Sequence, residues 1–360
     1  MKCLFFLLLI IILKVYAQTN IPFNSPRWKI TAKEAVLEEY LGKPCLKITN
    51  GSALLSDAAF RNGIIEFDIA IEHARYFPGM GFRVQDSANA EEFYLRPHQS
   101  GNPDAMQYYP EFNGSGGWQL YYGRGFGNAH ALPFDRWLHI KMLIKNDQGE
   151  VYFDDEKEPV LFMEKLKRPI AAGMISLENQ WPVAARYANF SYTATDDVTL
   201  KSKPVPFEPL PAGVITTWQV SSPFDEKLVN NKPLLSSFDT SSLTWQSLTV
   251  EERGVADLSI LAGAVPGKNT VFARVVIESE KAETKKLTFG FSDRAKLYFN
   301  GRLLYSGEDN FLSRDYRFLG TMGYYDAVYL NLKKGKNEVW IAISEDIGGW
   351  GVQAKLEKIL

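Results

Sequence analysis

The sequence has few of the residues that cross-link or metallate small folds, with 2 cysteines and 4 histidines in 360 residues. Cys3 precedes an apolar run that we expect to be cut away, which leaves Cys45 alone and rules out an internal disulfide. The histidines, which show no metal-ligand spacing, are His73, His98, His130 and His139. A disulfide scaffold, a cysteine-based metal site and a Cys–His nucleophile pair therefore have no support, and no cofactor is predicted.

A large charge excess and helical periodicity are also lacking. The formal net charge is −2, so no overall field draws nucleic acid or an anionic membrane to the chain. Beyond the N-terminal run, no stretch is long and apolar enough for a membrane helix. We therefore predict no nucleic-acid partner and no transmembrane segment, and the oligomeric state stays open.

The N-terminus has the pattern of a secretory signal peptide. Lys2 gives a positive start, residues 4–13 are almost wholly apolar, and Val15 and Ala17 stand at the usual cleavage offsets. The apolar run is too short to span a bilayer. We predict that residues 1–17 are removed, and that the mature protein is secreted to an extracellular or periplasmic compartment.

Apolar and polar residues alternate along most of the chain, which is the period of a half-buried strand. Residues 65–72 and 137–145 are two clear examples. Turn signals between such runs stand at Asn50-Gly51, Asn62-Gly63, Pro78-Gly79, residues 146–149 and Ala172-Gly173. Many short strands at near-regular spacing predict an all-β fold of the sandwich or barrel type.

A proline-rich run divides the chain. Its prolines are Pro204, Pro206, Pro209 and Pro211, which favour a stiff extended linker. A second series of strand-like runs follows, with a hairpin signal at Asn300-Gly301. We predict two β-sandwich (jelly-roll) domains, residues 18–198 and 214–360, joined by linker 199–213. Each domain should fold alone, because few contacts need cross the linker.

The stretch 92–123 gathers residues that suit sugar recognition. Flat aromatic rings stack on the C–H face of a pyranose, and amide, imidazole and guanidinium groups bond its hydroxyls. The residues predicted to contact a ligand are Arg96, His98, Gln107, Tyr109, Asn113 and Trp118. Ordinary strand and core packing is the alternative explanation of the same aromatics.

Two parts of the sequence resemble known families. The motifs at residues 60–68, 81–84, 93–98, 136–141 and 151–154 resemble the concanavalin A-like lectin/glucanase superfamily, in its laminin-G-like and 3-keto-disaccharide-hydrolase-like forms. The motifs at residues 291–301, 318–320, 326–330, 334–338 and 348–351 resemble a galactose-binding-like β-sandwich. The first resemblance implies a jelly roll that holds ligands on its concave face or rim loops, and the second implies a companion sandwich.

The first resemblance raises a catalytic hypothesis. Laminarinase-type members carry their catalytic carboxylates on one strand in an E-x-D-x-x-x-E pattern, which Glu66, Asp68 and Glu72 match. In a flat strand Glu66 and Glu72 would lie about 20 Å apart, whereas a retaining glycosidase needs about 5–5.5 Å. The flanking tryptophans of those enzymes are also missing, so a solvated acidic face is the favoured interpretation.

His98 beside Asp104 is a second catalytic candidate. A histidine next to a carboxylate could act as acid or base and remove a proton beside a ketone. This would suit the lyase activity attached to some relatives of the first part. A structural polar cluster is the favoured alternative.

The leading hypothesis is a secreted carbohydrate-binding protein whose first jelly roll holds a glycan or polysaccharide. The first alternative is a carbohydrate-active enzyme, either a glycoside hydrolase or a 3-keto-glycoside lyase/hydrolase. The second alternative is a structural or adhesive surface protein. Calcium stays unsupported as a cofactor, since Asp309 and Asn310 offer oxygen ligands without EF-hand spacing.

Overall fold

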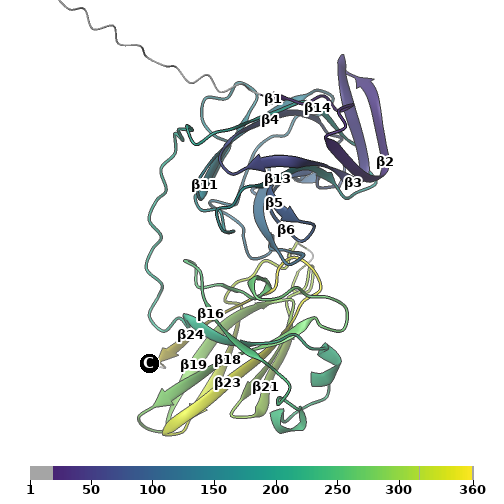
Figure 1. The fold of residues 1–360 in the computed structure, drawn as a ribbon. Helices are drawn as coiled ribbons and strands as arrows, with labels where there is room; N and C mark the ends of the chain where they lie inside the picture. The colour runs from purple at the N-terminus through teal and green to yellow at the C-terminus, as the bar shows by residue number, and fades with distance from the viewer. Residues whose placement is uncertain (1–18, 316, 359–360) are drawn as a thin grey trace, which may run out of the picture.

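The computed structural model describes residues 19–315 and 317–358, so the predicted signal peptide lies outside the described residues. The described chain consists of antiparallel strands, turns and four short 3₁₀ helices, arranged as an N-terminal and a C-terminal group of strands (Figure 1). The prediction of an all-β sandwich fold is confirmed.

The N-terminal part is one continuous 14-stranded sheet. Its strand order is β12-β11-β10-β4-β14-β3-β13-β5-β6-β7-β8, with β1 on β14, β2 on β3 and β9 on β7. The strands are β1 (Thr19–Asn20), β2 (Trp28–Tyr40), β3 (Lys43–Phe60), β4 (Gly63–Ala70), β5 (Gly79–Asp86), β6 (Asn89–Leu95), β7 (Met106–Phe112), β8 (Ser115–Gly116), β9 (Gly127–Asn128), β10 (Leu138–Lys145), β11 (Gln148–Phe153), β12 (Leu161–Met163), β13 (Gly173–Asn179) and β14 (Ala185–Ala194). The 3₁₀ helix η1 (Pro97–Gln99) follows β6.

The long strand β3 lets this sheet fold over itself. Its first half pairs with β14 and its second half with β13, so two sections of the sheet lie face to face. Fully buried side chains such as Phe67 of β4, Phe82 of β5 and Phe93 of β6 fill the space between them. Because side chains alternate along a strand, the same strands direct their other residues outward.

One predicted turn is wrong. Asn50-Gly51 does not separate two strands but lies inside β3. Asn50 has a left-handed backbone with φ 46°, and β2 passes so close that a Cβ on Gly51 would lie 2.2 Å from the Ala32 Cα. The Asn-Gly pair therefore supplies a left-handed backbone residue and room for the neighbouring strand inside β3. A hairpin turn needs the same two residue types, so the sequence pattern is the same in both cases.

The C-terminal part is a sandwich of two sheets. A six-stranded sheet of order β16-β15-β18-β23-β20-β21 packs on a four-stranded sheet of order β17-β24-β19-β22, with Phe291, Ile341 and Trp350 in the core between them. The strands are β15 (Thr217–Ser221), β16 (Trp245–Thr249), β17 (Ala256–Asp257), β18 (Thr270–Ser279), β19 (Glu283–Ser292), β20 (Arg294–Phe299), β21 (Arg302–Glu308), β22 (Asp326–Leu332), β23 (Gly335–Ser344) and β24 (Gly351–Lys358). The short helices are η2 (Glu226–Val229), η3 (Leu235–Ser237) and η4 (Leu258–Ile260).

The hairpin predicted at Asn300-Gly301 is confirmed. It joins β20 to β21, and its two residues have φ values of 47° and 81°. Positive φ at both positions is the backbone of a type I′ turn, whose twist matches that of the flanking strands.

The two parts meet at a buried surface, so the expectation that few contacts cross between them is wrong. The Gln119 backbone N–H donates to the Gly348 carbonyl at 2.7 Å, and the Gln119 carbonyl accepts from the Met322 N–H at 3.0 Å. Leu120 is 4% exposed and belongs to the same core as Met322 and Val255. The loop that carries Gln119 and Leu120 is thus packed into the C-terminal part.

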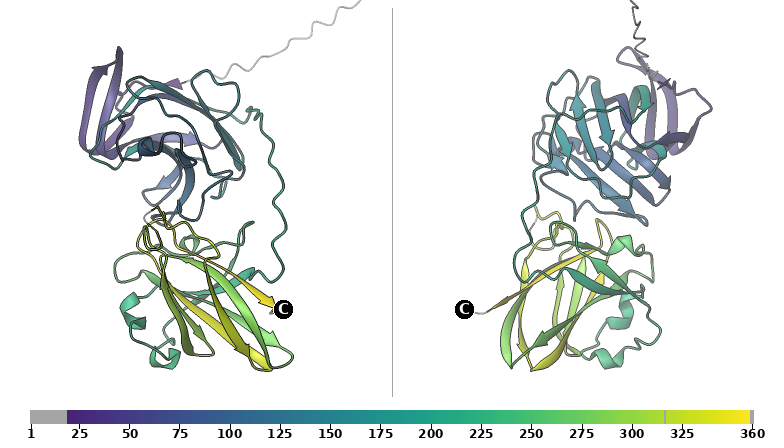
Figure 2. Two further views of the ribbon diagram at one scale, coloured as in Figure 1. Left: turned by 180° about the vertical axis from the view of Figure 1, so that it is seen from behind. Right: turned by 60° about the vertical axis from the view of Figure 1, so that its left-hand side comes forward.

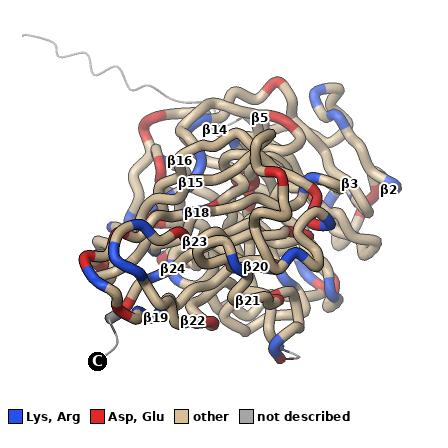
Figure 3. The backbone as a smooth tube through the Cα atoms, turned by 90° about the horizontal axis from the view of Figure 1, so that it is seen from below, with Lys and Arg blue, Asp and Glu red and all other residues tan. Residues whose placement is uncertain are grey.

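The connection between the two parts is extended. Residues 202–211 carry neither helix nor strand and run along one side of the molecule (Figure 2). The domain boundaries at residues 198 and 214 stay a prediction. Lys and Arg positions are intermixed with Asp and Glu positions along the backbone in Figure 3. Among the described residues, no helix is long and apolar enough to cross a membrane.

Candidate functional site

A cleft of about 470 Å³ opens on the outer face of the N-terminal sheet, where that face meets loops of the C-terminal part. Its N-terminal walls come from β13, β5, β6 and β7 and from the loops beside them. Phe311, Leu319 and Ile347 close it from the C-terminal part. Both parts of the chain therefore build the cleft.

Two glycines of β5 lie at or beside the cleft: Gly79 lines it, and Gly81 is the next residue on the same face of the strand. The strand registers place Gly81 between Ser176 of β13 and Glu92 of β6. Gly79, two residues earlier, lies between the same two strands. A Cβ on Gly81 would lie 2.5 Å from the Ser176 Oγ and 2.8 Å from the Glu92 Oε1. Because these glycines have no side chains, side chains of both neighbouring strands occupy the space above β5.

Aromatic rings form one wall. Phe77 meets the rings of Tyr94 and Trp181 edge-on, with ring centroids 5.7 and 5.2 Å apart. Trp118 lines the cleft from the loop after β8. Phe77, Trp118 and Trp181 are each half-buried, so a part of each ring is accessible from the cleft.

Arg96 and Tyr109, both predicted contact residues, line the cleft. Arg96 is only 6% exposed. Its guanidinium lies over the rings of Tyr94 and Trp118, at 5.0 and 5.7 Å from their centroids, and 3.6 Å from the Asp104 carboxylate. Replacing Arg96 would therefore disturb packing as well as any ligand contact.

His98 also lines the cleft, half-buried against the Phe77 ring. No hydrogen bond or ion pair joins His98 to Asp104 in the described residues, and Asp104 lies 3.6 Å from the Arg96 guanidinium, which agrees with the favoured interpretation of a structural polar cluster. The His98 Nδ1 is buried and has no hydrogen-bond partner among the described residues. Burial, with Arg75 and Arg96 nearby, lowers the pKa of His98, so a neutral imidazole faces the cleft at pH 7.

Two predicted contact residues lie outside the cleft. Gln107 is 2% exposed, and its amide donates to the Trp118 carbonyl at 2.8 Å and accepts from the Tyr94 hydroxyl at 2.8 Å. Asn113 points to the C-terminal part, where its amide donates to the Ser259 carbonyl at 2.8 Å. Gln107 therefore holds the loop that carries Trp118, and Asn113 joins the two parts.

Two carboxyl groups of the cleft were not predicted. Glu92 of β6 is buried at its base, and the half-buried Glu178 of β13 accepts a hydrogen bond from the Ser176 hydroxyl at 2.7 Å. Burial first, and then the charge of Glu178, raises the pKa of Glu92 well above the usual range. Glu92 and Arg96 are separated by an even number of residues, so they lie on the same face of the strand, and the neighbouring strand β5 has glycines at alternate positions. These two sequence patterns could have pointed to Glu92.

The carboxylates of the acidic run 66–72 do not converge on a cavity, and only part of the run is solvated. Asp68 is 4% exposed and lies 2.7 Å from the His139 Nδ1 and 2.6 Å from the Lys43 amine. Glu66 lies 3.9 Å from the His139 Nε2, and the exposed Glu72 is ion-paired elsewhere. The three carboxylates are thus tied to cations along the strand and do not converge on a cavity.

The ion pair on β4 predicts a pH dependence of stability. Hydrogen bonds to Asp68 and then Glu66 raise the pKa of His139 from 6.5 to about 9. A raised folded-state pKa stabilises fully below the unfolded value, and this stabilisation is lost as the pH rises through about 9. The free energy of unfolding should therefore fall by about 1 kcal/mol from about pH 6 to about pH 9.5, a small value because solvent screens a partly exposed pair.

Urea unfolding across that pH range measures the effect. The matched control is His139→Gln, which keeps a polar side chain at the same place but does not titrate. The free energy of unfolding of His139→Gln should fall less between these pH values than that of the wild type, and the difference should equal the effect predicted above. Parallel profiles of the two proteins would contradict the prediction.

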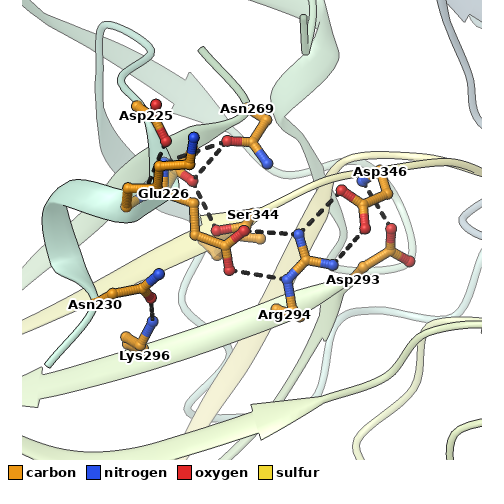
Figure 4. A network of polar contacts seen from close by, with 12 residues as sticks. Asp225, Glu226, Asn230, Asn269, Asp293, Arg294, Lys296, Ser344 and Asp346 are labelled. Atoms are coloured by element: carbon orange, nitrogen blue, oxygen red, sulfur yellow. Dashed lines mark hydrogen bonds and ion pairs between the residues drawn. The ribbon is translucent and has the colours of Figure 1, made fainter. Parts of the chain in front are cut away.

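A second polar network lies on the C-terminal part (Figure 4). Arg294 donates to Glu226 at 2.8 Å and to Asp346 at 2.5 Å, and Asp293 accepts from the Asp346 backbone N–H at 2.8 Å. These groups satisfy one another and fix the loop that follows β23. Within residues 19–315 and 317–358, no group of three or more His, Cys, Asp or Glu side chains is arranged to hold a metal ion.

No protein-family model and no curated protein matches the chain. Among solved structures, it is similar to the carbohydrate-binding module CBM66 from Bacillus subtilis, at 17% identity and a TM-score of 0.36, over 47% of this chain and 97% of that one. A Bacillus subtilis protein with a galectin-like fold matches at 12% and 0.36, over 49% and 94%. Bacillus licheniformis β-glucanase matches at 12% and 0.36, over 49% and 98%. These likenesses are weak.

Proposed function

We propose that this protein binds a glycan in the cleft between its N-terminal sheet and its C-terminal loops. The observation that carries the proposal is the combination of half-buried tryptophans and hydrogen-bonding groups beside the glycines of β5. Trp118 and Trp181 offer flat faces to sugar C–H groups, and Arg96 and His98 offer polar atoms to hydroxyls. A volume of about 470 Å³ falls in the usual range for small-ligand sites, about 300–1,000 Å³.

The structural or adhesive alternative has less support, because a purely structural surface has no need of a cleft that leaves two tryptophan rings half-buried and a buried imidazole nitrogen without a hydrogen-bond partner. The pattern of residues 1–17 supports the further proposal that the protein acts outside the cytoplasm. We place the glycan site in the N-terminal part with a wall from the C-terminal part.

Replacing Trp181 by alanine should weaken glycan binding by about tenfold or more, ~1.5 kcal/mol, because a stacking face is lost. A glycan array with the mature protein finds the ligand, and calorimetry with the best glycan then measures the difference in Kd. The matched control is Trp137→Ala, since Trp137 is also half-buried but bonds the Tyr40 carbonyl at 3.2 Å, away from the cleft. Equal losses in the two variants, or a wild type that binds no glycan, would overturn the proposal.

A further inference from the structure

The carboxyl group of Glu92 is buried in the cleft without a partner. Glu92 is 6% exposed and lines the cleft, and no described residue hydrogen-bonds its carboxyl group. Leaving a buried polar group unpaired destabilises a fold, so such groups are uncommon away from functional sites. The carboxyl group is therefore free to bond whatever enters the cleft.

The surroundings of Glu92 favour its protonated form. The acidic groups that act on it are Glu178 from β13, Glu111 from β7 and Glu91 from its own strand, and the Tyr109 phenol lies on the facing strand. Burial and these negative neighbours raise the pKa of Glu92, so it keeps its proton at a pH where an ordinary glutamate has lost it. A carboxyl group in this state can donate a proton to a substrate.

Glu178 lies close to Glu92 across the glycine strand. A Cβ on Gly81 would be 2.8 Å from the Glu92 Oε1 and 2.5 Å from the Ser176 Oγ, and that hydroxyl donates to the Glu178 Oε1 at 2.7 Å. These three steps limit the separation of the two carboxyl oxygens to about 8 Å at most. Paired catalytic carboxyls of glycosidases lie about 5–5.5 Å or about 6.5–9.5 Å apart, so the pair is close enough for that chemistry.

We propose that the cleft hydrolyses a glycosidic bond, with Glu92 as the proton donor and Glu178 as the carboxylate that activates water. This rests on the proposed glycan binding. The Glu92 proton passes to the glycosidic oxygen as its bond to C1 breaks, so the leaving sugar departs as an alcohol. Glu178 takes a proton from a water whose oxygen bonds to C1, and exchange with solvent returns both groups to their starting states. Water is the only co-reactant.

The roles follow from the surroundings of each carboxyl group. Glu92 is the more deeply buried, and no described group donates a hydrogen bond to its carboxyl group, which suits the acid. Glu178 is half-buried and already accepts a hydrogen bond from Ser176, which suits a carboxylate held in place to take a proton. The substrate is a polysaccharide whose sugar rings stack on the tryptophan wall.

The test uses the full mature chain and a panel of laminarin, xylan, galactomannan, pectic galactan and levan. Release of new reducing ends and mass spectrometry of the products report cleavage, and affinity electrophoresis reports binding. Glu92→Gln should cut cleavage by at least about 100-fold while binding and melting temperature stay near those of the wild type, because glutamine keeps the shape but has no proton to give. Glu178→Gln should lose cleavage as well and keeps the bond from Ser176.

Glu66→Gln is the matched control, because Glu66 lies on β4 away from the cleft, and it should cleave as the wild type does. Cleavage by the wild type should fall as the pH rises through the pKa of Glu92. A wild type that binds a polysaccharide of the panel but releases no product would overturn the hydrolysis proposal and leave glycan binding standing. Full cleavage by Glu92→Gln would also overturn it. A wild type that binds nothing would overturn glycan binding, and the hydrolysis proposal with it.

Discussion

Expressed without the C-terminal part, residues 18–198 should unfold about 10 °C below the intact protein. The loop after β8 would lose its cover, because Leu120 and Tyr121, at 4% and 3% exposure, pack in one core with Met322 and Val255. Each fully buried apolar side chain of this size stabilises by about 1.5–3 kcal/mol, and a loss of 1 kcal/mol lowers the Tm of a domain of this length by about 2–4 °C.

Polar contacts across the same surface add to the expected decrease in Tm. The Tyr121 hydroxyl donates to the Asp257 carboxyl at 2.9 Å and contacts the Glu251 carboxylate at 2.5 Å. Lys167 pairs with Glu252 at 2.9 Å. Removing the C-terminal part leaves the Tyr121 hydroxyl and the half-buried Lys167 amine without these partners.

Calorimetry of the intact protein and of both pieces, residues 18–198 and 212–360, measures this effect. The intact protein should show one cooperative transition, because the shared surface couples the two parts. The matched control is the intact chain with a protease site inserted near residue 205 and then cut. It should keep its Tm, since the surface and not the linker holds the parts together. A piece 18–198 that melts with the intact protein would show that the surface contributes little.

Gly81→Ala should weaken glycan binding and any cleavage by at least about 100-fold at a modest cost in stability. The added Cβ would meet the Ser176 Oγ at 2.5 Å and the Glu92 Oε1 at 2.8 Å, so both side chains must move. Both contacts are with side-chain atoms and not with the backbone, so the fold can relax at a cost of about 1–3 kcal/mol. The cleft, by contrast, loses the position of Glu92, which lines it, and of Ser176, whose hydroxyl holds Glu178.

Gly79→Ala is the matched comparison on the same strand. Its Cβ would lie 2.2 Å from the Phe93 backbone oxygen, which is fixed in the sheet and cannot move aside. This variant should therefore lose much more stability than Gly81→Ala. Thermal melts and calorimetric titration of the two variants separate the effect on the fold from the effect on the site. Unchanged binding by Gly81→Ala would show that the ligand does not depend on the positions of Glu92 and Ser176.

The candidate site could be predicted only in part. Arg96, His98, Tyr109 and Trp118 were predicted because their residue types suit a sugar and because they cluster within one short stretch, and all four line the cleft. Gln107 and Asn113 share that stretch, but the tertiary structure uses them to hold the Trp118 loop and to join the two parts. Residue type and closeness in sequence could not separate ligand contacts from internal hydrogen bonds.

The sequence by itself determined that this protein is all-β, because alternation with period 2 fixes which residues of a strand face inward. It also determined the hairpin at Asn300-Gly301, because that turn depends only on the φ angles of two neighbouring residues. Only the tertiary structure decided the cleft, since Glu92 and Glu178 stand on strands far apart in sequence that become neighbours through Gly81 of β5. Strand parity shows that two side chains share a face, but the order of strands in the sheet decides whether they meet, and long-range packing sets that order.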